Sequence, residues 1–247
     1  KDDRLFINLN KEEANKKTGI NLNKEGIFFP HAGWIESKSI CEQMTRDRRI
    51  RMYDGEEIRK ITQRKKRFYL SSSNKSYKVD EVCLCTSFET NNLVEVEGIN
   101  INRGQATFIT TNQQIKNLAM PICGKGYISP KKDGCHAVGA TYENLNKIDI
   151  SDKDHVKNIK NLKLFMSGEY EIVGGYVGFR ATTPDYLPLV GRVNNIFINI
   201  GHGSRGSTSG PFCAEYIADL IDQRPKSLSM EIQEAIDVNR FKDLKET

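Results

Sequence analysis

An apolar run followed by a glycine-rich turn lies near the end of the chain and limits what it can fold into. "NIFINI" (195–200) leads into "GHGSRG" (201–206), and "PFCAEYIADLI" (211–221) has the spacing of an amphipathic helix. The G-x-G-x-x-G spacing is typical of a dinucleotide-binding turn that opens a helix. That motif also requires a second strand ending in an acid about 20 residues later, whereas Asp222 follows a helix here. The ordinary Rossmann interpretation is therefore rejected, and a plain glycine turn before a helix is the alternative.

Composition indicates a folded chain with a basic excess. Of its 247 residues, 38% are hydrophobic and 28% charged, and the net charge is +5. This excess permits a polyanionic partner such as RNA but does not require one. No run of about 18 apolar residues and no signal peptide is present, so we expect no membrane association and a cytoplasmic protein. The chain starts at Lys1, which leads us to expect a part of a longer protein.

The cysteines and histidines indicate no metal site. Their spacing matches no zinc motif, and "CLC" (83–85) is not a C-x-x-C pair. We therefore predict no metal, a reducing compartment and reduced cysteines, several of them buried in strands.

The periodicity predicts an α/β chain with mixed α+β character. Two short apolar runs, 81–85 and 194–200, are typical of buried parallel strands. Between these runs the sequence pattern is typical of strands. We therefore predict that 1–92 and 186–247 flank a β-rich domain, 93–185. The remaining predicted helices are 12–19, 37–50 and 151–166. Ser151 and Asp154 have the spacing of a capping box at the start of the last helix. The predicted strands are 56–62, 66–72, 76–79, 104–110, 125–130, 135–142 and 170–183.

Four stretches occur in the order seen in one family. They are "NRGQ" (102–105), "YISPKKDGCHAVGATY" (127–142), "GFRATTPDYLPLVG" (178–191) and "GHGSRG" (201–206). Together they resemble FAD-dependent oxidases of the D-amino-acid and glycine oxidase superfamily. With "GIFFPHAGW" (26–34), they are most similar to the oxidoreductase half of bifunctional enzymes that modify the wobble uridine of certain tRNAs. The resemblance covers roughly residues 20 to 225.

The resemblance implies a partial FAD-binding Rossmann-like domain, 1–92 and 186–247, and a mixed or antiparallel substrate-binding sheet domain, 93–185. It also implies that the glycine-rich turn points at the isoalloxazine ring of FAD, where a helix N-terminus stabilises negative charge. The family's N-terminal FAD-binding turn and ribose-binding acid are not found in these residues. The implied cofactor-binding residues are Gly203, Ser204, Arg205, Gly206, Arg103, Gly104 and Gln105, although 103–105 could instead form a strand-entry turn.

The same resemblance implies two substrate-binding side chains. Arg180 would hold a substrate carboxylate, because guanidinium is planar, bidentate and always charged, and Tyr127 would place its phenol over that carboxylate. The alternatives are a strand arginine paired with Asp185 or another acid, and an ordinary core tyrosine. No residue is assigned as catalytic, and neither His31 nor His202 is taken as a base, because the cofactor performs the oxidation.

The implied reaction is oxidative removal of the carboxymethyl group, as glyoxylate, from 5-carboxymethylaminomethyl-(2-thio)uridine in tRNA, with a methyltransferase domain as partner. One alternative is a free glycine, sarcosine or D-amino-acid oxidase. Another is a non-catalytic RNA-binding remnant, because "CLCTSFET" (83–90) replaces a glycine-containing strand end of the family. The basic stretches 45–51 and 63–67 could contact tRNA phosphates or form a solvated face.

Overall fold

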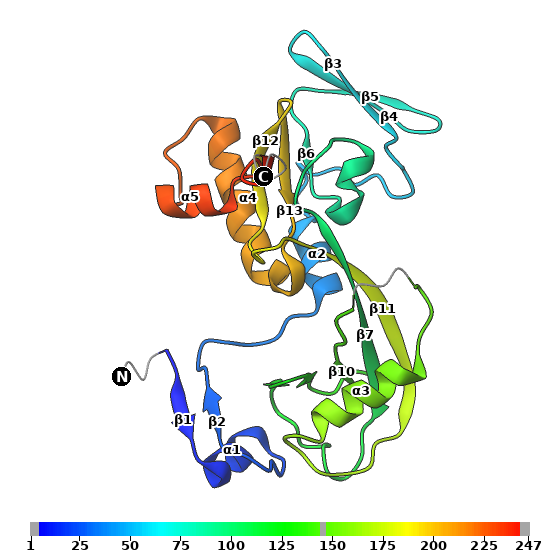
Figure 1. Ribbon diagram of the computed structural model, residues 1–247, viewed down its shortest axis with the longest axis vertical. Helices are drawn as coiled ribbons and strands as arrows, with labels where there is room; N and C mark the ends of the chain where they lie inside the picture. The colour runs from blue at the N-terminus through cyan, green and yellow to red at the C-terminus, as the bar shows by residue number, and fades with distance from the viewer. Residues whose placement is uncertain (1–4, 144–146, 243–247) are drawn as a thin grey trace. The chain divides into compact units, whose positions relative to one another are not determined.

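The computed structural model describes residues 5–143 and 147–242, and it divides into two compact units (Figure 1). Unit 1 contains Lys1–Glu36 and Arg103–Phe179, and unit 2 contains Ser37–Asn102 and Arg180–Thr247. Two long strands, β7 (Asn100–Thr110) and β11 (Ile172–Thr182), continue from one unit into the other. No helix in the described ranges is long and apolar enough to cross a membrane.

The centre of unit 2 is a small sheet with both faces covered. Its order is β12 (Leu189–Val193), β13 (Ile196–Ile200), β6 (Cys83–Leu84), and β13 is parallel to β6. All five residues of β13 are buried, as predicted for a parallel-type strand. Ile196, Ile198 and Ile200 join one core cluster, whereas Phe197 packs into another with Tyr216 of α4 (Gly206–Asp222). The remaining helices of unit 2 are α2 (Ser37–Met44), η1 (Ser87–Asn92), η2 (Gly203–Arg205) and α5 (Met230–Ile236).

A three-stranded antiparallel meander completes unit 2. It consists of β3 (Lys60–Arg64), β4 (Arg67–Ser71) and β5 (Ser76–Val79), close to the predicted strands. Ile61, Phe68, Leu70 and Val79 alternate with polar residues and pack on the cluster that contains β13. This period of two leaves the other face of the meander to solvent.

Unit 1 is built on a five-stranded sheet of order β11-β7-β10-β9-β8. Its short strands are β8 (Ile122–Cys123), β9 (Tyr127–Ile128) and β10 (Cys135–Gly139), and α3 (Asp152–Leu162) packs against β10 (Figure 1). The predicted strands 125–130 and 135–142 correspond to β9 and β10, which pair antiparallel as a hairpin. The N-terminal segment adds β1 (Ile7–Leu9), α1 (Lys11–Thr18) and β2 (Gly26–Phe28).

The grouping of the N-terminal segment differs from the predicted boundaries, which joined 1–36 to the piece 1–92 and 186–247. Ala14, Ile20 and Leu22 lie in one buried cluster with Ile109 and other residues of the five-stranded sheet. A main-chain hydrogen bond from Ala119 N to the Thr18 carbonyl also ties α1 to unit 1. Burial of these apolar side chains therefore decides the grouping, and the predicted roles of the domains stay predictions.

Several local predictions are corrected. Helix α2 ends at Met44 rather than near residue 50. Ser151 caps α3 without a side-chain hydrogen bond, so the predicted capping box is wrong; Asp154 has another partner, described below. All six cysteines are free, but the expectation that several are buried in strands is wrong: Cys83 and Cys85 are exposed because they flank Leu84, which takes the core side, and only Cys213 is buried. The predicted helix at 12–19 is confirmed, and Gly19 ends it with a φ of 77°.

Candidate functional site

The glycine-rich turn packs closely against the segment that follows β11. Gly201 and Gly203 have φ values of +76° and +55°, a region that favours glycine. A Cβ at Gly201 would come within 3.3 Å of Thr183 Cγ2, and one at Gly203 within 3.2 Å of Thr182 Cγ2. Asn102 Nδ2 also donates to Thr182 Oγ1, at 2.5 Å. The start of β7, the end of β11 and the turn therefore meet within unit 2.

The helix that follows the turn presents an uncapped N-terminus. Helix α4 has 17 residues, and no side chain caps its first turn, which begins with Gly206, Ser207 and Thr208. Free main-chain N–H groups and the helix dipole favour negative charge at such an end. A Cβ added at Gly210 would meet no atom within 4 Å, so packing within the protein does not demand glycine there. Arg205 is exposed and forms no ion pair with another described residue.

His202 links this turn to β13 and α4 by hydrogen bonds, a role that the sequence did not indicate. Its Nδ1 lies 2.8 Å from Ser209 Oγ, and its Nε2 lies 2.9 Å from Asn199 Oδ1. Burial lowers the pKa of His202, which favours the neutral ring. A neutral ring protonated on Nε2 donates to Asn199 Oδ1 and leaves Nδ1 as an acceptor for the Ser209 hydroxyl, which also lies 3.1 Å from the Arg205 carbonyl. The imidazole thereby joins the end of β13 to the first turn of α4.

Arg180 lies on β11, two residues before Thr182, so the two side chains leave the same face of the strand. Arg180 is half-buried with its Nη1 fully buried, and its side chain makes no hydrogen bond or ion pair with the residues that the structure describes. A buried, unpartnered guanidinium nitrogen is costly, because a charged donor loses its water without replacement. Such a donor is suited to an anionic ligand.

Asp185 is held by Arg240 and does not pair with Arg180, so that alternative is wrong. Arg240 Nε and Nη2 donate to the two carboxylate oxygens, each at 2.9 Å. Burial of Asp185 acts to raise its pKa, but hydrogen bonds from Arg240, Leu187 N and Thr183 outweigh burial and lower the pKa to about 2. The nearest acid in sequence therefore leaves Arg180 uncompensated.

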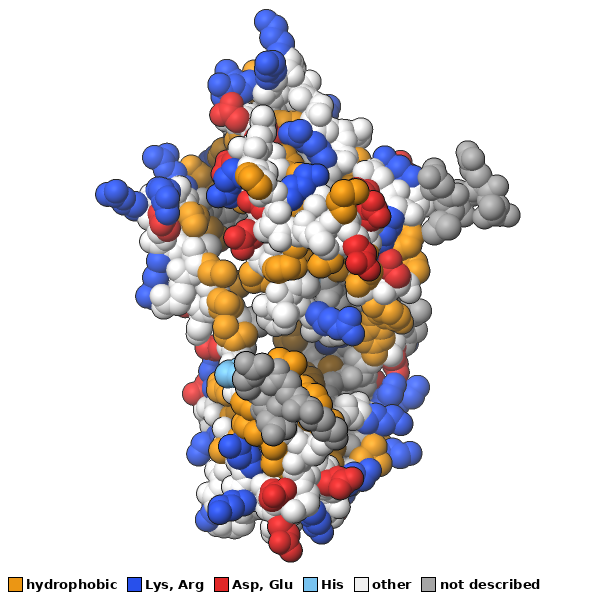
Figure 2. All heavy atoms as spheres, turned by 90° about the vertical axis from the view of Figure 1, so that its left-hand side faces the viewer, with side chains coloured by type: hydrophobic (Ala, Val, Ile, Leu, Met, Phe, Trp, Pro, Cys, Tyr) orange, Lys and Arg blue, Asp and Glu red, His pale blue; other side chains and the backbone are white. Residues whose placement is uncertain are grey.

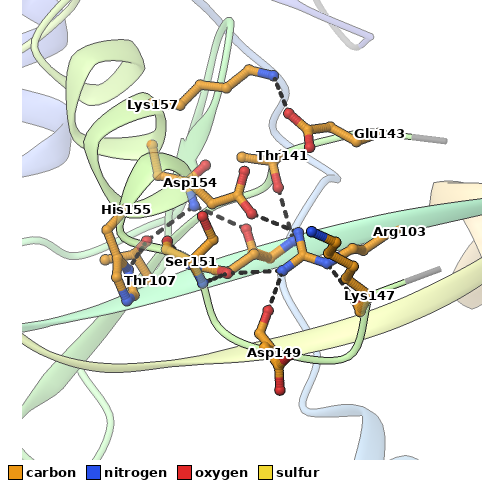
Figure 3. Close-up of polar contacts among 12 residues, drawn as sticks. Arg103, Thr107, Thr141, Glu143, Lys147, Asp149, Ser151, Asp154, His155 and Lys157 are labelled. Atoms are coloured by element: carbon orange, nitrogen blue, oxygen red, sulfur yellow. Dashed lines mark hydrogen bonds and ion pairs between the residues drawn. The ribbon is translucent and has the colours of Figure 1, made fainter. Parts of the chain in front are cut away.

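Arg103 fastens the start of α3 to β7 within unit 1 (Figure 3). Its Nη1 contacts Asp154 Oδ2 at 2.5 Å, and both side chains are at most 3% exposed. Its Nε donates to the Lys147 carbonyl at 2.7 Å, and Nη2 donates to the Asp149 carbonyl at 2.6 Å and to Gln105 Oε1 at 3.1 Å. The whole guanidinium is thus engaged by protein atoms, a structural role; a contact with flavin stays a prediction.

Gln105 extends the same buried network. Its side chain accepts from Ser151 N and donates to the Ser151 carbonyl, and Asn158 Nδ2 donates to the Gln105 carbonyl. Asn158 also reaches Thr107 Oγ1, which lies 2.9 Å from His155 Nδ1. Residues 103–105 therefore lie in the buried middle of β7, and the alternative that they form a strand-entry turn is wrong.

The remaining predicted residues are placed as follows. Gly104 is buried in β7, and Tyr127 is half-buried in β9, opposite Gly139 of β10. Both belong to unit 1, whereas Arg180 and the turn Gly203–Gly206 belong to unit 2. The described residues contain no group of three His, Cys, Asp or Glu suited to a metal ion.

The residues of unit 2 suit the ring of the flavin that the resemblance implies. An uncapped helix end, an exposed arginine and a glycine with open space beside it suit a planar group that carries negative charge when reduced. The unpartnered Nη1 of Arg180 adds a second place for an anion. Gly203, Ser204, Arg205 and Gly206 are the residues that would hold the ring.

Comparison with known proteins identifies relatives of the same type. The chain is similar to the tRNA 5-methylaminomethyl-2-thiouridine biosynthesis bifunctional protein MnmC of Ectopseudomonas mendocina (strain ymp), with 26% identity over 97% of this chain and 43% of that protein. The protein of the same name from Nitrosospira multiformis is 27% identical over 87% of this chain and 38% of its own length. The chain thus spans about two fifths of these curated relatives.

Solved structures show the same fold. Glycine oxidase from Geobacillus kaustophilus superposes with a TM-score of 0.81 at 16% identity, over 95% of this chain and 67% of that one. Iminodiacetate oxidase from Chelativorans sp. BNC1 gives a TM-score of 0.76 at 17% identity, over 94% and 67% of the two chains. The family described as FAD dependent oxidoreductase (DAO) matches residues 5–220. With this match over most of its length, the chain belongs to the FAD dependent oxidoreductase family.

Proposed function

We propose that this chain oxidatively removes the carboxymethyl group of 5-carboxymethylaminomethyl-(2-thio)uridine at the wobble position of tRNA and releases it as glyoxylate. The printed names of its relatives support a role in tRNA modification. A methyltransferase partner domain, implied by the same resemblance, would then complete the modified base.

Arg180 is the observation that carries this proposal. The group to be removed is an N-alkylated glycine, which ends in a carboxylate. A buried guanidinium nitrogen without a protein partner matches that carboxylate, and its charge needs an anion for compensation. Arg180 would therefore fix the substrate by the end that is lost, whatever the size of the attached nucleoside.

Each side chain has a limited task in the reaction. FAD, when bound, supplies the two-electron oxidation of the C–N bond. The N-terminus of α4 and Arg205 stabilise negative charge that develops in the site, while His202 holds the turn in place. Water then splits the oxidised C=N bond of the substrate, giving glyoxylate and the aminomethyl base. Tyr127, Arg103, Gly104 and Gln105 stay proposed contacts of substrate and flavin.

The decisive experiment supplies the chain with FAD and then with tRNA that carries the carboxymethylaminomethyl base. Digestion of the tRNA and mass spectrometry of its nucleosides should show the aminomethyl base, with an equal amount of trapped glyoxylate. Turnover of free glycine, sarcosine or a D-amino acid, with the tRNA unchanged, would replace the proposal with a free amino-acid oxidase. Failure to bind flavin, together with retained RNA binding, would indicate the non-catalytic remnant.

A further inference from the structure

The basic excess of this chain is concentrated in one short segment. Residues 59–79, which contain the meander β3-β4-β5, carry eight Lys or Arg and no Asp or Glu. Since the whole chain has a net charge of +5, the remaining residues together carry −3. The meander is therefore a part of the protein with an electrostatic preference for a polyanion.

The strand register places much of this charge on one face. Lys60 faces Ser71 across the ladder, Arg64 faces Arg67, and Tyr69 faces Lys78. Opposite residues in an antiparallel ladder point to the same side, so Lys60, Arg64, Arg67 and Lys78 share the face that is turned away from the core. The β3–β4 turn adds Lys65 and Lys66. The blue side chains at the top of Figure 2 lie over this hairpin, which Figure 1 shows at the top of unit 2.

Most of these cations lack a partner within the part of the chain that the structure describes. Ion pairs are seen for Arg67 with Asp80, and for Arg59 and Lys75 with neighbouring glutamates. The unpaired members are Lys60, Arg64, Lys65, Lys66 and Lys78. Exposed pairs contribute little stability, so even the paired cations can exchange their partner for a phosphate.

An aromatic ring lies among the cations. Tyr69 is half-buried on the central strand β4, and the Arg64 guanidinium lies 5.6 Å from its ring centroid. Single-stranded nucleic acid is held by sheet faces that combine backbone-binding cations with aromatic rings on which bases stack. Lys65, in addition, has a φ of 55°, where glycine or asparagine is favoured. Lys65 thus occupies the turn at a backbone cost.

We infer that the outer face of the β3-β4-β5 meander binds the phosphate backbone of single-stranded RNA. This inference rests on the proposed function, because that function makes tRNA the substrate. The face holds the tRNA by its backbone, while Arg180 selects the modified base. Binding to the face is independent of the wobble modification, since phosphates carry no sequence information.

The test measures the salt dependence of tRNA binding by fluorescence anisotropy between low and moderate KCl. The triple variant R64Q/K65Q/K66Q removes three charges, so the slope of log K against log salt should fall by about 2 for single-stranded contacts. Its matched control, K11Q/K16Q/K24Q, removes three exposed lysines of unit 1 and should keep the original slope. Melting curves confirm that both variants fold.

An unchanged slope in R64Q/K65Q/K66Q, or an equal fall in the control, would overturn the binding face. Glyoxylate formation by the same samples separates this result from the proposed function. Turnover of the modified nucleoside with an unchanged slope refutes the face alone. A reduced slope in the variant, with no glyoxylate from the unsubstituted chain, by contrast supports the face and refutes the reaction.

Discussion

Replacing Arg180 should move stability and activity in opposite directions. Arg180 Nη1 is buried without a partner among the described residues, and a buried unsatisfied donor costs about 1–3 kcal/mol. Arg180→Met keeps an unbranched apolar stem and removes that cost. Because about 1 kcal/mol corresponds to roughly 2–4 °C for a chain of this size, we expect the melting temperature without substrate to stay level or rise by a few degrees.

Under the proposed function, the same substitution removes the charge that would bind the substrate carboxylate. Loss of one partner of a buried charge pair costs about 2–5 kcal/mol, so a value near 3 kcal/mol lowers kcat/KM roughly 100-fold. Differential scanning calorimetry and glyoxylate release, measured on the same preparation, provide the two readouts. Arg192→Met is the matched control, because Arg192 lies in the same unit but is 48% exposed and pairs with Glu81. It should leave turnover unchanged.

A clear loss of stability in Arg180→Met, with turnover retained, would refute this reasoning. That result would mean that the guanidinium holds the protein together, as Arg103 does. A fall of kcat/KM in both Arg180→Met and Arg192→Met would instead indicate a general effect of lost positive charge.

Three further outcomes follow from the described contacts. Asp154→Asn leaves the buried guanidinium of Arg103 without its counter-charge, so chemical denaturation should show a loss of about 3 kcal/mol or more. Because its pKa is lowered to about 2, Asp185 stabilises the fold above about pH 4 and loses this effect as the pH falls through 2. After solvent screening, the stabilisation amounts to about 1 kcal/mol. Arg240→Gln should raise the pKa of Asp185, which an NMR titration can measure. His202→Phe removes two hydrogen bonds from the turn, so flavin titration should show affinity weakened about tenfold, a net loss of roughly 1–2 kcal/mol; unchanged affinity would contradict its positioning role.

Sequence patterns by themselves determined the local elements and the family. Period-two alternation and continuous apolar runs predicted the meander and β13, because burial of one or both sheet faces depends on residue order alone. The glycines at 201, 203 and 206 predicted a turn that opens a helix, and α4 begins at Gly206. Four motifs in the family's order led to the FAD dependent oxidoreductase family, which matches residues 5–220.

Tertiary structure alone decided which charged groups pair. Asp154 has the spacing of a capping residue, yet it binds Arg103, 51 positions away; Asp185 is near Arg180 in sequence, yet Arg240 holds it from 55 positions away. Partners so distant leave no periodic signal, since a charged side chain selects whichever group the fold brings into the same buried space. The free nitrogen of Arg180 therefore emerges only when the chain is folded, whereas the sequence shows the basic stretch 63–67 and folding decides which side of the meander carries it.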